Sequence, residues 1–304
     1  MTDGDVRRAL LEGHGLDSPA DAAYNTDYMK LVEKDGGFSG QVSRLRPDLK
    51  EIPVVDLNGR LLCVEQRSDG QTRPDRPNTV VIMAGGKGLR LRPLTEETPK
   101  PLLHVGGKPI LQHIIHSLRG EGFTDIVLAI NYLGEQIEEF FQDGFRFGVN
   151  IRYLKEDRAL GTAGALSLFR DAPSSPVVVM NGDIILSSSI GKMLDYHEEN
   201  LATITVGAKV VETIIPYGVM TTNGRVIEGI EEKPTRRDLV NAGVYVLNPE
   251  VVASVTPDQV TDMPQLIVEN LKGGKALAFP LHETWADLGS PQQLKRAHEL
   301  LVGE

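Results

Sequence analysis

Cysteine is almost absent from this chain, with Cys63 the only one among 304 residues. One cysteine cannot form an intrachain disulfide, so a disulfide framework is excluded, and so is a zinc site built from cysteines. The scarcity of cysteine therefore fits a reducing, cytoplasmic setting.

Long hydrophobic runs and basic clusters are also missing. No stretch approaches the roughly 18 consecutive apolar residues of a membrane span, and the charged segment 3–8 is unlike the apolar part of a signal peptide. The chain has 32 Lys and Arg against 42 Asp and Glu, a net charge of -10, and no basic run suited to a phosphate backbone. We therefore expect neither a membrane nor a nucleic acid as partner.

The chain does contain enough apolar material for a large core. Hydrophobic residues make up 40% of the sequence, which suits one large α/β domain with a small additional module. The segment 67–78 is polar throughout and contains Pro74 and Pro77, as linkers often do. We place the small module at residues 1–72, the linker at 73–77 and the large domain at 78–304.

The large domain alternates between short β-rich runs and a helical pattern. The runs span residues 79–84, 125–131, 150–154 and 176–181. Residues 109–120 lie between the first two runs, and their apolar side chains recur at helical spacing. This alternation predicts βαβ units and a mostly parallel sheet flanked by helices, an α/β fold.

Other patterns predict antiparallel pieces and a final helix. Asn58-Gly59 and Asn223-Gly224 are typical of tight hairpin turns, the first inside a strand pair at 52–65. Residues 241–247 are a further strand candidate. The last helix is expected to begin at Pro291, with Ser290 as its N-cap.

A loop of small residues follows the first strand directly. Residues 84–90 read Ala-Gly-Gly-Lys-Gly-Leu-Arg, and Pro99-Lys100-Pro101 comes soon after. Such a loop lets backbone N–H groups approach phosphate oxygens, while Lys87, Arg90 and Lys100 supply countercharge. A plain glycine turn with solvated basic residues is the alternative. The spacing fits neither a Walker A loop nor a dinucleotide fingerprint, which needs a glycine where Leu91 stands.

Two further clusters carry polar residues at strand ends. Asn181-Gly182-Asp183 closes the strand 176–181, and a carboxylate there suits magnesium, although Asn-Gly-Asp is also ordinary turn chemistry. Glu231-Glu232-Lys233-Pro234 follows the second hairpin and precedes Asn241-Ala242-Gly243. In isolation, the Glu-Lys-Pro triplet would be interpreted as a solvent-exposed strand end.

Taken in order, these motifs resemble the nucleotide-sugar pyrophosphorylases, also called sugar-1-phosphate nucleotidyltransferases. Residues 85–102 match that family's Gly-Gly-x-Gly-x-Arg-Leu-x-Pro-Leu-Thr and Pro-Lys-Pro-Leu signature, except that Leu89 replaces the usual Thr. The resemblance extends from about Asn78 to the C-terminus. It implies a Rossmann-like fold of the nucleotide-diphospho-sugar transferase type, with residues 78–304 as catalytic domain.

The resemblance also implies roles for individual residues. Magnesium would be held by Asp183 and by Asp287 of the Trp285–Gly289 motif, and catalysis would depend on Arg90, Lys100, Asp183 and Lys233. The nucleotide-binding residues would be Ala84, Gly85, Gly86, Lys87, Gly88, Asn131, Gly161 and Thr162. The sugar phosphate would contact Gly164, Glu232, Lys233, Asn241 and Gly243.

The implied reaction transfers a nucleoside monophosphate from an NTP to a sugar-1-phosphate and releases pyrophosphate. The overall pattern is similar to mannose-1-phosphate guanylyltransferases and to a group of glucosamine-1-phosphate guanylyltransferases that carry CBS domains, which favours GTP and a cell-surface sugar pathway. Uridylyl or thymidylyl transfer is the alternative among enzymes. A nucleotide-sugar sensor without catalysis is the alternative from another class.

The N-terminal module resembles an incomplete CBS pair. Thr2 and Asp5 match the Thr-x-x-Asp of such a motif, and residues 52–65 resemble the strand pair of a second one, with Gln66 where a Thr is usual. A small α+β module is therefore expected. It would either sense a regulatory nucleotide or serve structurally, packing on the catalytic domain or joining copies into a homo-oligomer.

Overall fold

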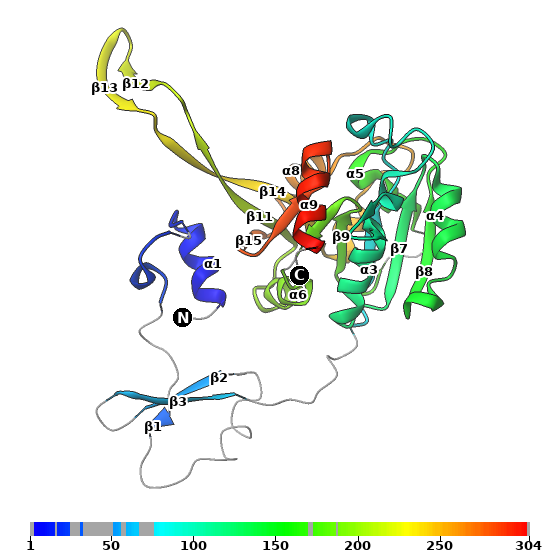
Figure 1. Ribbon diagram of the computed structural model, residues 1–304, viewed down its shortest axis with the longest axis horizontal. Coiled ribbons are helices and arrows are strands. Elements are labelled where there is room, and N and C mark those ends of the chain that lie inside the picture. Colours follow the sequence, from blue (N-terminus) through cyan, green and yellow to red (C-terminus); the bar gives the residue numbers. More distant parts are fainter. Residues whose placement is uncertain are drawn as a thin grey trace.

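The computed structural model describes residues 3–15, 17–24, 31–32, 51–55, 59–66, 76–169, 173–186 and 188–302. A seven-stranded sheet forms the centre of the molecule (Figure 1). From one edge to the other its strands are β15 (Ala276–Leu281), β11 (Ile204–Ile214), β14 (Thr235–Leu247), β9 (Val177–Asn181), β4 (Val80–Met83), β7 (Asp125–Ile130) and β8 (Asn150–Lys155).

The sheet is mostly parallel, as the sequence predicts. Strands β9, β4, β7 and β8 run parallel to one another, and β15 runs parallel to β11. Only β14 opposes both strands beside it, β9 and β11. The four predicted β runs are the four strands β4, β7, β8 and β9, and the predicted strand 241–247 is the inner half of β14.

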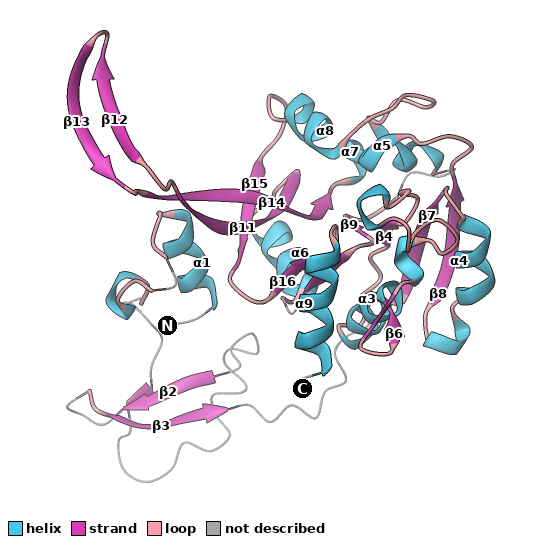
Figure 2. Cartoon of the chain, turned by 45° about the horizontal axis from the view of Figure 1, so that its top comes forward, coloured by secondary structure: helices cyan, strands magenta, loops and turns pink. Residues whose placement is uncertain are grey.

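Helices cover both faces of the sheet and make a three-layer structure (Figure 2). One face carries α3 (Ile110–Gly120), α4 (Gly134–Phe141), α6 (Ile190–Glu199) and α9 (Pro291–Val302). The other carries α5 (Gly161–Gly164), α7 (Pro249–Ala253) and α8 (Met263–Asn270). No helix in the described ranges is long and apolar enough to cross a membrane.

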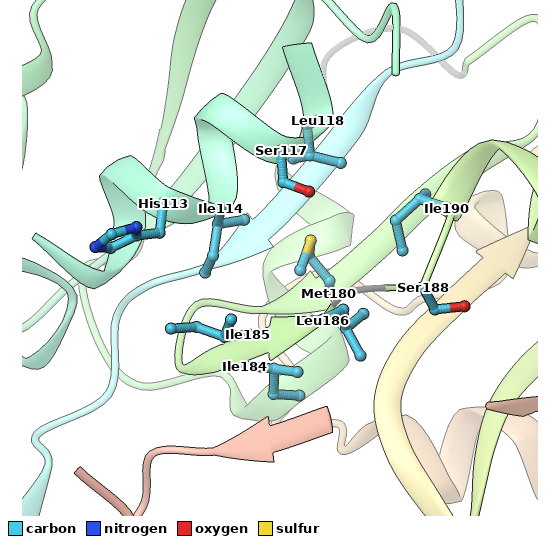
Figure 3. Close-up of a pocket in the computed structure, with 10 residues that line it drawn as sticks. All are labelled: His113, Ile114, Ser117, Leu118, Met180, Ile184, Ile185, Leu186, Ser188 and Ile190. Carbon is cyan, nitrogen blue, oxygen red and sulfur yellow. The ribbon is translucent and has the colours of Figure 1, made fainter. Parts of the chain in front are cut away.

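Helix α3 illustrates how the sequence pattern becomes packing. Its apolar residues recur every three or four positions, so they form one stripe that faces the sheet and is fully buried. A small cavity of about 30 Å³ remains between α3 and the strand β10 (Ile184–Leu186), lined mainly by apolar side chains (Figure 3). That volume holds about one water molecule, so it is a packing defect of the core and no substrate site.

Strands β11 and β14 continue beyond the sheet as a two-stranded ribbon. The ribbon ends in a hairpin of β12 (Gly218–Asn223) and β13 (Val226–Glu232), which projects away from the body in Figure 1. Asn223 pairs with Val226, so the turn has two residues and begins as the Asn223-Gly224 signal predicts. Short pairs complete the domain: β10 with β16 (Trp285–Asp287), and β5 (His104–Val105) with β6 (Lys108–Pro109).

Among its described residues, the N-terminal part contains helix α1 and a separate small sheet. Helix α1 (Asp3–Leu11) packs on the edge strand β15 with Ala9 and Leu10 buried. Strand β2 (Glu51–Val55) pairs antiparallel with β3 (Leu61–Gln66) and parallel with β1 (Leu31–Val32), which matches the strand pair expected at 52–65. Thr2, Asn58 and most of the expected linker lie outside the described residues, so the CBS resemblance and the domain boundaries stay predictions.

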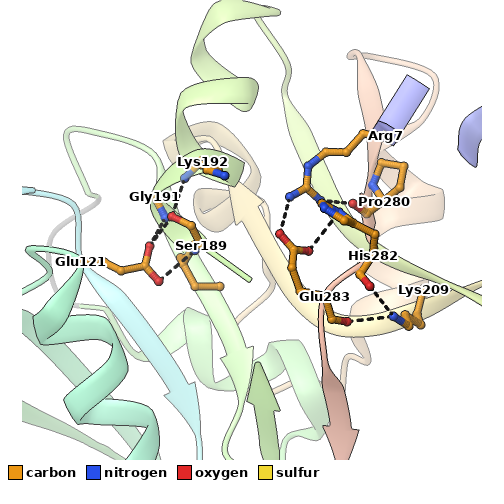
Figure 4. Close-up of polar contacts among 10 residues, drawn as sticks. Arg7, Glu121, Ser189, Gly191, Lys192, Lys209, Pro280, His282 and Glu283 are labelled. Atoms are coloured by element: carbon orange, nitrogen blue, oxygen red, sulfur yellow. Dashed lines mark hydrogen bonds and ion pairs between the residues drawn. The ribbon is translucent and has the colours of Figure 1, made fainter. Parts of the chain in front are cut away.

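Glu121, just after α3, caps the beginning of α6 (Figure 4). Its buried carboxylate accepts hydrogen bonds from the Ser189 hydroxyl at 2.6 Å and from the backbone N–H groups of Ile190 at 3.2 Å and Gly191 at 2.8 Å. A carboxylate at a helix N-terminus satisfies otherwise unpaired N–H groups and interacts favourably with the helix dipole. This contact therefore ties two helices on one face together.

We predict that Glu121→Ala lowers the free energy of unfolding by about 2–3 kcal/mol, because three buried donors lose a charged acceptor. Glu121→Gln keeps one acceptor oxygen and should lose less. Urea unfolding followed by circular dichroism measures both variants. Equal stability of Glu121→Ala and the wild type would contradict the capping role.

His197 on α6 is buried between two polar side chains. Its Nε2 lies 3.0 Å from Asn248 Oδ1, and its Nδ1 lies 2.9 Å from Thr205 Oγ1. The Asn248 amide nitrogen donates to Ala202 O and Glu250, so its oxygen is the acceptor and the His197 proton belongs on Nε2. Burial lowers the pKa of His197, although its bond to Asn248 opposes this effect.

This depressed pKa predicts a loss of stability in weak acid. Below about pH 6.5, the ordinary pKa of histidine, the unfolded chain binds a proton that the folded His197 resists. The stabilisation is therefore complete above that pH and falls as the pH drops from 6.5 through the lower folded pKa. Unfolding midpoints measured from pH 7.5 to pH 5 should fall less steeply in His197→Gln, and parallel curves would refute the prediction.

Candidate active site

A cleft of about 600 Å³ opens at the carboxyl ends of β4 and β9. This is the sheet edge where loops that follow parallel strands meet, and the volume suits a nucleotide-sized ligand. Ten of the predicted site residues line the cleft, namely Ala84, Gly85, Gly86, Lys87, Gly88, Arg90, Lys100, Gly161, Thr162 and Asp183.

The glycine-rich loop leaves β4 and forms one wall of this cleft. A Cβ atom added at Gly86 would meet no atom within 4 Å, so a ligand can reach the backbone there. The Thr95 hydroxyl donates to the Gly88 carbonyl at 2.9 Å and holds the far end of the loop. Lys87 and Arg90 are exposed at its rim. The loop thus offers both N–H groups and positive charge to an anion.

Lys100 supplies a buried cation beside the glycine-rich loop, where a Cβ atom at Gly88 would lie 3.3 Å from the Lys100 Cβ. It lies between Pro99 and Pro101, begins a single turn of 3-10 helix, and is only 8% exposed. Its ammonium group donates to a carboxylate oxygen of Asp183, which is partly exposed to the cleft. The pairing fixes the lysine and the aspartate relative to each other, because separating them would leave the buried charge of Lys100 without a partner.

Asp287 is brought beside Asp183 by strand pairing. Ile184 of β10 lies opposite Asp287 of β16, and the Leu288 N–H donates to the Asp183 carbonyl at 2.9 Å. Gly289 lines the cleft and lies close to both Arg90 and Asp287. A Cβ atom at Gly289 would lie 2.6 Å from Arg90 Nη2 and 3.0 Å from Asp287 Oδ1. Arg90, Lys100 and Asp183 therefore line the cleft together, while Asp287 lies at its border beside Gly289 and lines a second hollow with Glu283 and Trp285.

These carboxylates suit a hard divalent cation. Magnesium is commonly bound through one or two protein carboxylates together with substrate phosphates. In the described part of the chain, no three His, Cys, Asp or Glu side chains are grouped to hold a metal by themselves. The donor set at Asp183 and Asp287 thus fits a cation that arrives with a phosphate ligand.

Three of the predicted nucleotide-binding residues also contact other parts of the protein. Asn131 does not line the cleft; its amide donates to the backbone carbonyl of Glu156 at 2.6 Å and braces the neighbouring loop. Gly161 has φ +85°, and a Cβ there would lie 2.6 Å from the Thr261 carbonyl oxygen, so the position requires glycine. The Thr162 hydroxyl is bonded to Asp262 and accepts from the Met263 N–H.

Sequence reasoning missed one acidic residue of the cleft, Glu156. It follows β8, is half-buried, and accepts the Leu160 N–H at 2.9 Å. Burial raises the pKa of its carboxyl group, and the bond from Leu160 partly offsets this. A single glutamate after a strand carries no pattern that would have singled it out.

The predicted sugar-phosphate residues are divided between two places. A Cβ at Gly243 would lie 2.6 Å from the Asn181 amide nitrogen, so Gly243 and its neighbour Asn241 lie at the border of the cleft. Gly164 packs against Leu160 and Gln259 away from the opening.

Glu232 and Lys233 are not brought to the cleft. They precede β14 on the projecting ribbon, and the seven residues from Thr235 to Asn241 alone span about 20 Å of extended strand. The physical reason is that β11 and β14 stay paired beyond the sheet, so the ribbon continues outward with the strand direction.

A glycine-rich loop and paired charges at the carboxyl edge of a mostly parallel sheet define an α/β protein of the nucleotide-diphospho-sugar transferase type. Comparison with known proteins then gives the family. The chain belongs to the nucleotidyl transferase family, whose model matches residues 79–303. It is 36% identical over 224 residues to a mannose-1-phosphate guanyltransferase of Yarrowia lipolytica and 36% identical over 225 residues to one of Saccharomyces cerevisiae. Each match covers 70% of this chain and 61% of the relative's own length.

Solved structures agree on the fold. A crystal structure of a candidate glucose-1-phosphate thymidylyltransferase from Bacillus anthracis matches with a TM-score of 0.62 and 29% identity, covering 74% of this chain and 96% of that one. HddC from Yersinia pseudotuberculosis matches with a TM-score of 0.58 at 23% identity, covering 73% and 99%. The similarity to HddC shows a shared fold and nothing about function.

Proposed function

We propose that this protein transfers GMP from GTP to a hexose-1-phosphate of the mannose or glucosamine type and releases pyrophosphate. The observation that carries the proposal is that Lys100, Asp183 and Arg90 line one cleft beside a glycine-rich loop, with Asp287 at its border. Such a cluster suits a reaction between two phosphorylated substrates, because their repulsion is the main obstacle to bringing them together.

The reaction needs no nucleophile from the protein. An oxygen of the acceptor's phosphate attacks the α-phosphorus of the NTP while the bond to the pyrophosphate oxygen breaks. Arg90 and Lys100 would neutralise the charge that grows on the leaving pyrophosphate, and the loop 85–88 would hold the triphosphate through its N–H groups. A magnesium ion held by Asp183 and Asp287 would supply countercharge to the phosphates.

Glu156 is our candidate for reading the base. A carboxylate accepts two parallel hydrogen bonds, and the Watson–Crick edge of guanine offers two adjacent N–H donors. Uracil and thymine have one N–H on that edge, between two carbonyl oxygens that a carboxylate would repel. The names of the yeast relatives, mannose-1-phosphate guanyltransferases, support the same choice.

Thymidylyl transfer is the second candidate. It is favoured by the likeness to the Bacillus anthracis protein, whose name specifies glucose-1-phosphate and thymidylyl transfer.

For the acceptor, Asn241 and Gly243 remain our proposed sugar contacts at the cleft border. The proposed contacts of Lys233 and Glu232 with the acceptor need the ribbon to approach the cleft once substrate is bound.

The direct test is pyrophosphate release with four NTPs against a panel of hexose-1-phosphates in the presence of magnesium. We expect the highest kcat/KM with GTP. Lys100→Ala and Asp183→Asn should each lower kcat about 100-fold or more, since each removes a preorganised charge from the reacting phosphates. Lys108→Ala, which changes an exposed lysine outside the cleft, is the control. Unchanged turnover in both cleft variants would reject the proposal.

A separate variant tests base recognition. Glu156→Gln keeps the shape of the side chain but replaces one acceptor oxygen with a donor, so the ratio of kcat/KM for GTP over dTTP should fall about tenfold or more. Asp157→Asn changes the adjacent exposed carboxylate outside the cleft and should leave the ratio unchanged. If both variants keep the wild-type ratio, Glu156 does not read the base.

A further inference from the structure

Arg7 of α1 is buried against the edge of the catalytic sheet. Only 4% of its surface is exposed, and its guanidinium carbon lies 3.8 Å from the centre of the Phe279 ring. One guanidinium nitrogen donates to the Pro280 carbonyl, and another lies 2.9 Å from Glu283 Oε1 (Figure 4). An arginine is rarely buried unless it is paired, so this contact is a specific joint between α1 and the segment after β15.

A second cation holds the same segment from the sheet. Lys209 of β11 lies opposite Leu281, the last residue of β15. Its ammonium group donates to the backbone carbonyls of Glu283 at 2.8 Å and His282 at 3.4 Å. Residues 282–284 are thus held through the backbone by Lys209 and through the Glu283 carboxylate by Arg7.

This segment leads directly into β16. Trp285 begins the strand and Asp287 ends it, opposite Ile184. Because β16 has three residues, its position depends strongly on what holds its two ends. The C-terminal end of β16 is fixed by the hydrogen bond from the Leu288 N–H to the Asp183 carbonyl. Its N-terminal end is fixed by the contacts of Glu283.

We propose that Arg7 is a positioning residue for the carboxylate pair of Asp183 and Asp287, an inference that rests on the proposed function of that pair. By holding Glu283, α1 fixes the start of β16 and so the position of Asp287 relative to Asp183, and a small cation shared by two carboxylates tolerates little misplacement. The N-terminal segment thereby sets the affinity of the site for divalent cations. Anything that displaces α1 from β15 weakens cation binding.

The chain provides its own reporter for this coupling. Trp285 is the only tryptophan, its indole N–H donates to the Ala242 carbonyl at 3.0 Å, and it lies between Glu283 and Asp287 along the chain. Its fluorescence therefore reports on β16 alone. Manganese, a paramagnetic substitute for magnesium, should quench this emission when it binds beside Asp287, which gives a readout independent of turnover.

The experiment titrates manganese into the full chain in the presence of GTP, which supplies the phosphate ligands that two carboxylates alone lack, and follows Trp285 emission. Arg7→Ala should raise the manganese concentration at half-quenching about tenfold or more, the usual scale for losing a residue that orients metal ligands. Its emission without metal should shift to longer wavelength as β16 loosens. Arg8→Ala is the matched control, since Arg8 is half-exposed on the same helix and pairs with Asp5. It should match the wild type in both measurements.

Glu283→Gln serves as a second variant that leaves the contact of Arg7 with Phe279 and Pro280 in place, and circular dichroism checks that each protein is folded. It should weaken manganese binding as Arg7→Ala does. The double variant should bind manganese no more weakly than the weaker-binding single variant. Wild-type titrations in folded Arg7→Ala and Glu283→Gln would overturn the inference. Quenching that survives Asp287→Asn would instead reject the proposed metal site.

Discussion

The site depends on the pairing of β10 with β16, two three-residue strands from distant parts of the chain. Their register sets Ile184 opposite Asp287, and the Leu288 N–H donates to the Asp183 carbonyl, so backbone contacts bring Asp183 and Asp287 from distant parts of the chain to neighbouring positions. Like charges held close to each other repel, and this repulsion opposes the pairing. Lys100 on Asp183 and Arg90 beside Asp287 offset it. The same cations face anionic substrates, so the groups that make the carboxylate pair tolerable are also those that the reaction uses.

Much of this arrangement could be predicted from the sequence because it follows from local rules. Parallel strands end at one edge of a sheet, so the loop after β4 and the Asn-Gly-Asp after β9 had to lie close together once both runs were read as parallel strands. The alternation of β runs with the α3 pattern was sufficient for that reading. The helix at 109–120, the turn after Asn223 and the start of α9 at Pro291 follow from periodicity and from capping and turn residues alone.

The rest depends on contacts between segments that no short pattern encodes. Glu156 is a cleft residue only because Asn131 and Leu160 hold its loop against the end of β7. The Glu-Lys-Pro triplet was expected just after the hairpin, and the structure places Glu232 at the end of its second strand, β13. The sequence of the triplet does not show how far β11 and β14 stay paired beyond the sheet. That length decides whether Lys233 lies in the cleft or on the ribbon. Arg7 carries no signal at all, since an arginine on a polar helix is read as exposed unless its partner Glu283 is known.

The charge distribution explains how an acidic protein can gather two anionic substrates. The net charge of -10 would repel them at long range, but such repulsion between exposed charges is screened within about 10 Å at ordinary salt. The cleft is lined by the cations Lys87, Arg90 and Lys100 and by the carboxylates Glu156 and Asp183, and of the three cations only Lys100 is buried and thus screened much less. Lys100 is the most buried of the three and is held by Asp183, so its charge cannot relax toward water as phosphates approach. The placement of a few charged side chains around the cleft, more than the net charge of the chain, therefore determines what the cleft attracts.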